Sequence, residues 1–141
     1  MKVHISISEV PASYNEIMDF LKSDHTGAIA LFEGVVRSDV LDNGECVTHL
    51  FYEAHVPMVH AETSLLVEQM RQHCDVYAIF FHHLLGNVAV GQTSIWLGIA
   101  AQHRKEAFEA QTWFLNQFKQ RVPIWKKELG DQTQQWVVPH E

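Results

Sequence analysis

The alternation of apolar and polar positions predicts several β-strands. Val3, Ile5 and Ile7 alternate with polar residues and predict a strand over Lys2–Ser8. A nearly continuous apolar run over Ala28–Val36 predicts a buried strand. Further strands are predicted at Cys46–Glu53 (antiparallel to the strand before it), Val76–His83, Thr93–Ala101, Ile124–Glu128 and Gln134–Val138.

Apolar residues at spacings of three and four predict three helices. These run from Tyr14 to Leu21, from Pro57 to His73, and from His103-Arg104 to about Arg121. The third helix ends there because Pro123 has no N–H and disfavours helix at Val122. The faces expected to be buried carry Val59, Thr63, Leu66 and Met70 in the second helix, and Ala107, Ala110, Phe114 and Phe118 in the third.

The order of these elements predicts the fold class. Helices do not alternate strictly with strands, which favours an α+β fold with a mixed, mostly antiparallel sheet and three helices. Ser38–Glu45 is predicted to be a polar loop, and Leu84–Gly91 a turn region with two glycines. With 141 residues, 47% of them hydrophobic, the chain is expected to form a single domain over residues 1–141.

Composition narrows the expected location of the protein. No apolar run approaches the roughly 20 residues of a membrane span, so no membrane association is expected. The first residues alternate like a strand and lack the apolar block of a signal peptide. Cys46 and Cys74 are therefore expected to be reduced thiols in the cytoplasm.

Positive charge is concentrated in one segment, Ala100–Glu128, of a chain whose net charge is −7. The segment holds six of the ten Lys and Arg residues: Arg104, Lys105, Lys119, Arg121, Lys126 and Lys127. Such a local field attracts an anionic ligand. The acidity of the remaining chain argues against a nucleic-acid partner.

Lys119 and Lys126 are the first candidates for chemistry within this segment. A lysine near other cations has its ammonium form disfavoured and can act as a nucleophile or a proton shuttle. The alternative is that both are solvated surface lysines. In a strand, Lys126 and Glu128 share one face, opposite Lys127.

Two further positions are candidates for anion binding. Arg37 follows an apolar strand, where a guanidinium can bind phosphate or carboxylate, although a surface arginine at a strand end fits equally. His103 and Arg104 open a helix, whose free N–H groups favour anions. The ten histidines form no recognised metal motif, so neither a metal nor a cofactor is expected.

Five motifs in this order and spacing resemble the large subunit of molybdopterin synthase. They are Phe32-Glu33-Gly34-Val35-Val36-Arg37, Tyr52-Glu53-Ala54, His83-Leu84-Leu85-Gly86, Ala101-Gln102-His103-Arg104 with Ala107-Phe108-Glu109-Ala110, and Lys119-Gln120-Arg121-Val122-Pro123-Ile124-Trp125-Lys126-Lys127-Glu128. Family members often carry other residues at His55, Leu84 and Gln92.

The resemblance implies a function and a set of site residues. The family forms the dithiolene of molybdopterin from cyclic pyranopterin monophosphate. The sulfur comes from the C-terminal glycine thiocarboxylate of a small ubiquitin-like subunit. The resemblance implies an α/β hammerhead-like fold and a homodimer within a heterotetramer. Lys119 and Lys126 are implied to be catalytic, and the implied substrate pocket contains Val35, Val36, Arg37, His103, Arg104, Lys119, Lys126, Lys127 and Glu128.

Two other functions remain open from the residues alone. One is a non-catalytic module that docks a ubiquitin-like tail, and the other is a basic protein that binds phosphate or nucleic acid. The presence of both Lys119 and Lys126 favours the enzyme, because docking needs charge but not two lysines in one pocket. A nucleic-acid binder is expected to have a longer basic face with exposed aromatic residues.

Overall fold

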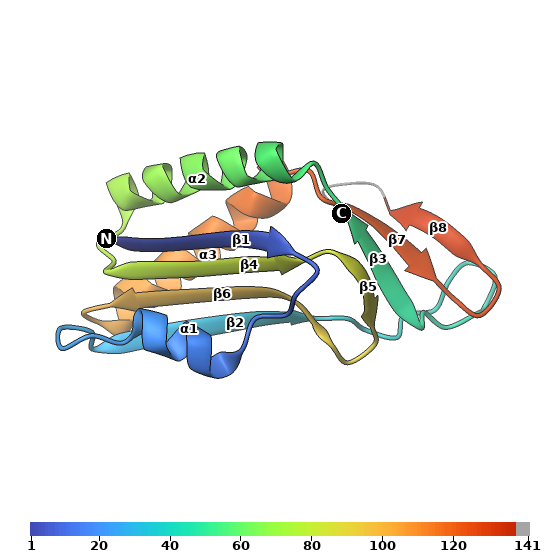
Figure 1. Cartoon of the computed structure of the whole chain (residues 1–141), viewed down its shortest axis with the longest axis horizontal. Helices are drawn as coiled ribbons and strands as arrows, with labels where there is room; N and C mark the ends of the chain where they lie inside the picture. The colour runs from blue at the N-terminus through green and yellow to red at the C-terminus, as the bar shows by residue number, and fades with distance from the viewer. Residues whose placement is uncertain (138–141) are drawn as a thin grey trace.

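The computed structural model describes residues 1–137, which form two four-stranded sheets and three helices (Figure 1). The first sheet has the spatial order β1 (Lys2–Ser8), β4 (Ala78–Leu84), β6 (Thr93–Ala101), β2 (Ala28–Val35). In this sheet β1 runs parallel to β4, whereas the pairs β4–β6 and β6–β2 are antiparallel. The second sheet is antiparallel throughout and has the order β5 (Gly86–Ala89), β3 (His49–Glu53), β7 (Trp125–Leu129), β8 (Gln134–Val137).

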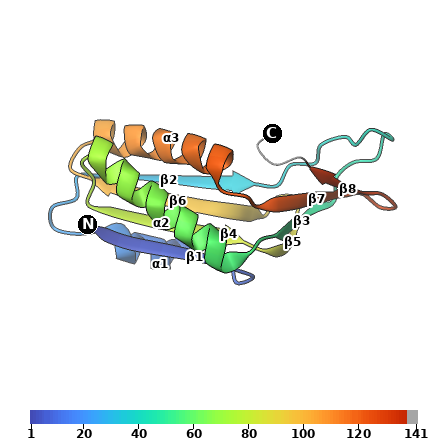
Figure 2. The ribbon, with the colours of Figure 1, turned by 90° about the horizontal axis from the view of Figure 1, so that it is seen from above.

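Helices cover both faces of the first sheet (Figure 2). On one face lie α2 (Val56–His73) and α3 (Arg104–Arg121), and on the other lies α1 (Tyr14–Leu21). The side chains of β4 alternate between the two cores, because successive residues of a strand point to opposite faces. Ile79 and Phe81 pack toward α2 and α3, whereas Ala78 and Phe80 pack toward α1.

The structure confirms the α+β class and the three helices. The predicted helix faces are buried. Their buried residues include Val59, Thr63, Leu66 and Met70 in α2, and Ala107, Ala110, Phe114 and Phe118 in α3. The third helix ends at Arg121, as the following proline requires. The last predicted strand is present over Gln134–Val137, and Val138 lies outside the described residues.

The predicted pairing of Cys46–Glu53 with the preceding strand is wrong. The strand begins only at His49 and pairs with β5 and β7 in the second sheet. The preceding chain folds back on itself, with a bridge between Val40 and Cys46 and a 2.7 Å hydrogen bond from Leu41 N to Glu45 O. Local hydrogen bonds there replace a ladder with β2, and both partner strands of β3 come from later in the sequence.

The region Leu84–Gly91, predicted to be a turn, contains the short strand β5. Gly86 begins this strand and Gly91 lies in the turn after it, with φ values of 82° and 88°. Glycine adopts such positive φ values readily, so the chain turns sharply on either side of β5. Through Leu85 the chain passes from β4 of the first sheet to β5 of the second, and the two sheets meet at this junction (Figure 1).

Candidate functional site

A cavity of about 610 Å³ lies where the two sheets meet, and we call it the junction pocket. Its walls come from β2 and the segment after it, from β3 and β7 of the second sheet, from β6, and from the end of α3. It contains three cationic side chains, Arg37, Lys119 and Lys126, and three carboxylates, Glu33, Asp39 and Glu128. Elements far apart in the sequence thus bring opposite charges into one pocket.

The two candidate lysines enter the pocket from different elements. Lys119 lies in the last turn of α3, beside the buried Phe118. Lys126 follows the helix stop at Pro123 and lies on β7. Glu128, two residues further, shares the pocket face of the strand, as the period of two predicts. Its Oε1 accepts a hydrogen bond of 3.1 Å from Gln135 Nε2 on β8.

Backbone hydrogen bonds fix the point from which Arg37 emerges. Val36 is 3% exposed, and its N–H donates to Gln92 O at 3.0 Å. Its carbonyl accepts from Gly91 N at 2.9 Å. The turn between β5 and β6 therefore holds Val36, and the Arg37 side chain extends from this fixed point into the pocket. Val35 also lines the pocket, so the sequence-predicted residues from 35 to 37 lie together.

A buried hydrogen-bond chain forms part of the pocket wall. Tyr52 Oη donates to Ser94 Oγ at 3.2 Å, and Ser94 Oγ donates to Gly34 O at 3.3 Å. Burial raises the pKa of Tyr52, and its hydrogen bond to Ser94 lowers that pKa by less. This chain links β3 of the second sheet to β6 and β2 of the first. Sequence reasoning missed Ser94 because a single serine in an apolar strand carries no signal of its own.

A buried histidine lies next to this wall. The His83 ring packs edge-on against Tyr52, with ring centroids 5.0 Å apart, and lies 6.3 Å from the Phe118 ring. Its Nδ1 is 2.8 Å from Leu84 O, and a carbonyl only accepts, so the proton is on Nδ1. Burial lowers the pKa of His83 to about 4, and the positive charge of Lys126 contributes to the lowering. His83 is therefore neutral at pH 7.

This lowered pKa predicts that the protein loses stability in acid. Below pH 6.5 the unfolded chain binds a proton at residue 83, whereas the folded chain binds it only near pH 4. His83 alone is expected to lower the unfolding free energy by on the order of 3 kcal/mol between pH 6.5 and 4. Burial also lowers the pKa values of His4 and His82, so these residues add to the loss of unfolding free energy as the pH falls.

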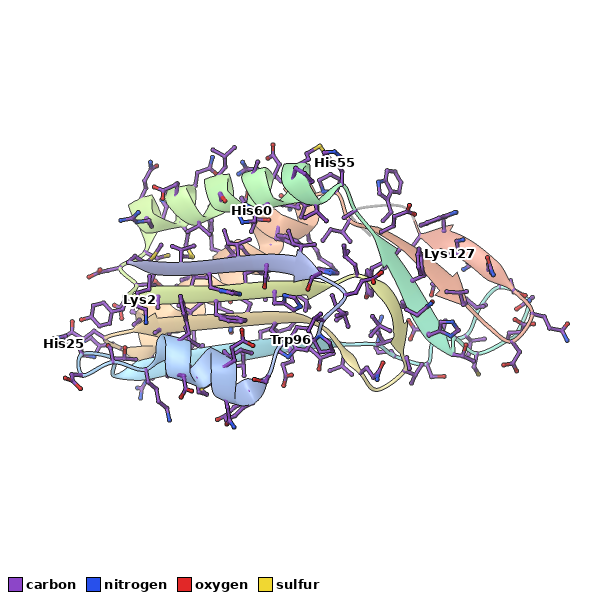
Figure 3. The ribbon with its side chains drawn as sticks, viewed as in Figure 1. Lys2, His25, His55, His60, Trp96 and Lys127 are labelled. Carbon is purple, nitrogen blue, oxygen red and sulfur yellow. The ribbon has the colours of Figure 1, made fainter. Side chains whose placement is uncertain are left out.

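Urea unfolding of the protein at a series of pH values measures this effect. His83→Gln is expected to flatten the fall in unfolding free energy between pH 6.5 and 4. His25→Gln removes an exposed histidine in the turn before β2 and serves as the control, with the full wild-type slope expected (Figure 3). A His83→Gln profile as steep as that of the wild type would contradict the assignment.

The structure does not bring every predicted site residue into the junction pocket. His103 and Arg104 lie at the start of α3, in a separate hollow of about 410 Å³ with Gln102 and Lys105. Lys119 lies at the other end of the same 18-residue helix. The basic segment is therefore divided between two places on the molecule rather than gathered in one patch.

Lys127 also lies outside the junction pocket, on the second sheet (Figure 3). Its Nζ is 4.6 Å from the centre of the Trp136 ring and 3.4 Å from Gln134 Oε1. The alternation of β7 causes this placement, because Lys126 and Glu128 occupy the pocket face. The structure therefore places Lys127 apart from the residues of the junction pocket with which the sequence motif groups it.

Within residues 1–137, no group of three or more His, Cys, Asp and Glu side chains is arranged to hold a metal ion. No helix in this part of the chain is both long and apolar enough to cross a membrane.

The class of this protein is defined by a two-sheet α+β fold whose pocket gathers cations from a helix, from a strand and from the segment that follows β2. The MoaE protein family matches residues 7–121. The molybdopterin synthase catalytic subunit of Pyrococcus abyssi is 33% identical over 138 residues, which cover 96% of this chain and 92% of that protein. The human protein of that name is 33% identical over 132 residues, covering 94% and 69%. The chain belongs to the MoaE family.

Solved structures share the fold. Molybdopterin synthase from Staphylococcus aureus superposes with a TM-score of 0.86 at 24% sequence identity, over 94% of this chain and 95% of that one. A complex of subunits 1 and 2 of the molybdopterin-converting factor from Helicobacter pylori contains a chain with a TM-score of 0.73 at 23% identity, over 96% and 89%. Both likenesses agree with the two-sheet architecture.

Proposed function

We propose that this chain is the catalytic subunit of a molybdopterin synthase. It transfers sulfur from the C-terminal thiocarboxylate of a small ubiquitin-like subunit to cyclic pyranopterin monophosphate, and the product carries the dithiolene of molybdopterin. The observation that carries the proposal is the convergence of Arg37, Lys119 and Lys126 in one pocket of a MoaE-family chain. Both reactants are anions, and three cations from separate elements suit them.

The three cations take different roles in this proposal. Arg37 offers a planar guanidinium, which matches a phosphate group. Lys126 is the partner of the tail's terminal carboxylate or thiocarboxylate. Lys119 is the catalytic amine that exchanges protons with the reacting groups. Val35, Val36 and Glu128 line the same pocket beside them.

His103 and Arg104 belong to this site only if a second copy supplies them. They lie fifteen or more residues from Lys119 on one helix, and each residue advances a helix by about 1.5 Å, which gives roughly 22 Å. One pterin monophosphate is too short to touch both ends. We therefore propose a homodimer in which each active site takes Lys119 from one copy and His103 and Arg104 from the other. With the two small subunits it forms a heterotetramer.

A reconstituted reaction tests the function directly. The purified chain is mixed with a thiocarboxylated small subunit and cyclic pyranopterin monophosphate, and molybdopterin is detected after conversion to a fluorescent derivative. Product that forms only when all three components are present supports the proposal. A complex that binds the tail but yields no molybdopterin would make the chain a docking module. The free thiols Cys46 and Cys74 suit a cytoplasmic reaction, because thiols stay reduced there.

Partner binding is expected to depend on the charge of Lys126. Lys126→Glu places a carboxylate where the tail's own carboxylate is proposed to lie, so the complex is expected to weaken by at least about tenfold, as measured by calorimetry. Lys22→Glu makes the same charge reversal on the exposed residue after α1 and is the control. Equal affinity of the two variants for the small subunit would place the tail site elsewhere.

A further inference from the structure

Arg37, the proposed phosphate ligand, is already paired with a carboxylate of its own chain. Its Nη2 donates to Asp39 Oδ2 at 3.2 Å. Both residues line the junction pocket. Their side chains are 82% and 50% exposed, so a ligand entering the pocket reaches both of them.

The backbone around the pair is fixed by hydrogen bonds. On one side, the hydrogen bonds of Val36 with Gln92 and Gly91 fix the backbone before Arg37. On the other side, Asp39 O accepts from Val47 N at 2.7 Å, and Ser38 Oγ donates to Val47 O at 3.2 Å. The backbone that carries Arg37 and Asp39 is therefore held by hydrogen bonds on both sides, which keeps the two side chains close to each other.

The contact is one that a phosphate can displace. A single N–O contact between two exposed side chains is weak, because water screens it and both side chains lose freedom. A phosphate group offers two free oxygens to the same guanidinium, with one negative charge in a cyclic diester and up to about two in a monoester or in inorganic phosphate at neutral pH. Once phosphate is bound to Arg37, the Asp39 carboxylate lies beside a second anion and repels it.

We propose that Asp39 sets the affinity of the pocket for phosphate-bearing ligands by competing with them for Arg37. It lowers the affinity for substrate and product alike, and it speeds their release because it re-forms its contact as the phosphate leaves. The proposal deepens the proposed function by naming a residue that tunes ligand binding at that site. The competition itself requires only a phosphate group and the Arg37 side chain.

Titration with inorganic phosphate tests the competition. Backbone amide shifts of the ¹⁵N-labelled full chain report binding at low ionic strength. Asp39→Asn keeps the size of the side chain and removes its charge, and it is expected to lower the dissociation constant for phosphate by roughly three- to tenfold. The difference from the wild type is expected to shrink at about 0.5 M sodium chloride, because salt screens exposed charges.

Two further substitutions separate competition from a general change in charge. Asp42→Asn makes the same charge change at an exposed residue that does not line the pocket, and it is expected to shift the dissociation constant by less than about twofold. In an Arg37→Gln background, Asp39→Asn is expected to lose most of its effect, because the shared guanidinium is absent.

Three results would each overturn the proposal. The first is a dissociation constant for Asp39→Asn equal to that of the wild type. The second is an equal effect of Asp39→Asn and Asp42→Asn. The third is the absence of phosphate binding in every variant, which would remove Arg37 as a phosphate ligand. None of these measurements uses the small subunit or the pterin, so a failure of sulfur transfer is observed separately.

Discussion

Replacing Lys119 by alanine is expected to abolish molybdopterin formation, with a loss of at least about 10²-fold in turnover. Lys119 is proposed to exchange the protons that sulfur transfer requires, and it enters the junction pocket from the end of α3. Alanine keeps the helix, since it has the highest helix propensity of all residues. The rate is measured in the reconstituted reaction at saturating pterin and small subunit.

Lys119→Arg separates proton exchange from electrostatic attraction. Arginine keeps the positive charge but is not deprotonated in proteins, so this variant is expected to bind the small subunit and still fail to form product. Circular dichroism and thermal unfolding of both variants verify that the fold is retained. Near-normal turnover by Lys119→Ala would contradict the proposed catalytic role of Lys119.

Mixed dimers of two inactive variants are expected to regain about half of the wild-type activity per dimer. In a dimer of Lys119→Ala with Arg104→Ala, one shared site collects both defects and the other has none. The two chains carry different affinity tags, so that only mixed dimers are purified and assayed. The geometric basis is the placement of Arg104 and Lys119 at opposite ends of α3, in separate hollows of one chain.

A matched pair provides the control for this experiment. Lys119 and Lys126 line the same pocket of the same chain. In a dimer of Lys119→Ala with Lys126→Ala, each site therefore carries one of the two defects, and no recovery is expected. Mixed dimers of Lys119→Ala with Arg104→Ala that stay as inactive as their parents would exclude the shared site.

The amphipathic helices and the first sheet were predictable from sequence because their signals are local. The spacing of Val59 to Met70 and of Ala107 to Phe118 defines a buried face, and Pro123 ends the third helix. The second sheet was not predictable in the same way. Its strand β3 is only five residues long and pairs with β7, more than seventy residues later. The pattern of apolar and polar residues within a strand does not reveal which distant strand it pairs with.

Charge singled out Lys119 and Lys126 as candidates, and strand alternation predicted that Glu128 shares a face with Lys126. The grouping of Arg37 with them rested on the family resemblance, and the structure lines the junction pocket with all four residues. The same alternation removes Lys127 from the pocket, although the motif groups all three residues together. Tyr52, Ser94 and Asp39 were missed as site residues, because their contribution depends on contacts between segments rather than on their own neighbours in sequence.

The junction between the two sheets has a consequence for how the pocket responds to its ligands. Lys119 is carried by a helix packed on the first sheet and Lys126 by a strand of the second, so the angle between the sheets sets their separation. A ligand that bridges the two lysines acts on this angle. By thermodynamic reciprocity, any contact that holds the two sheets near the angle found in the ligand-bound protein also strengthens binding of that ligand. The hydrogen bonds from Tyr52 to Ser94 and from Ser94 to Gly34 cross this junction, so they contribute to holding the two sheets at the angle that the pocket requires.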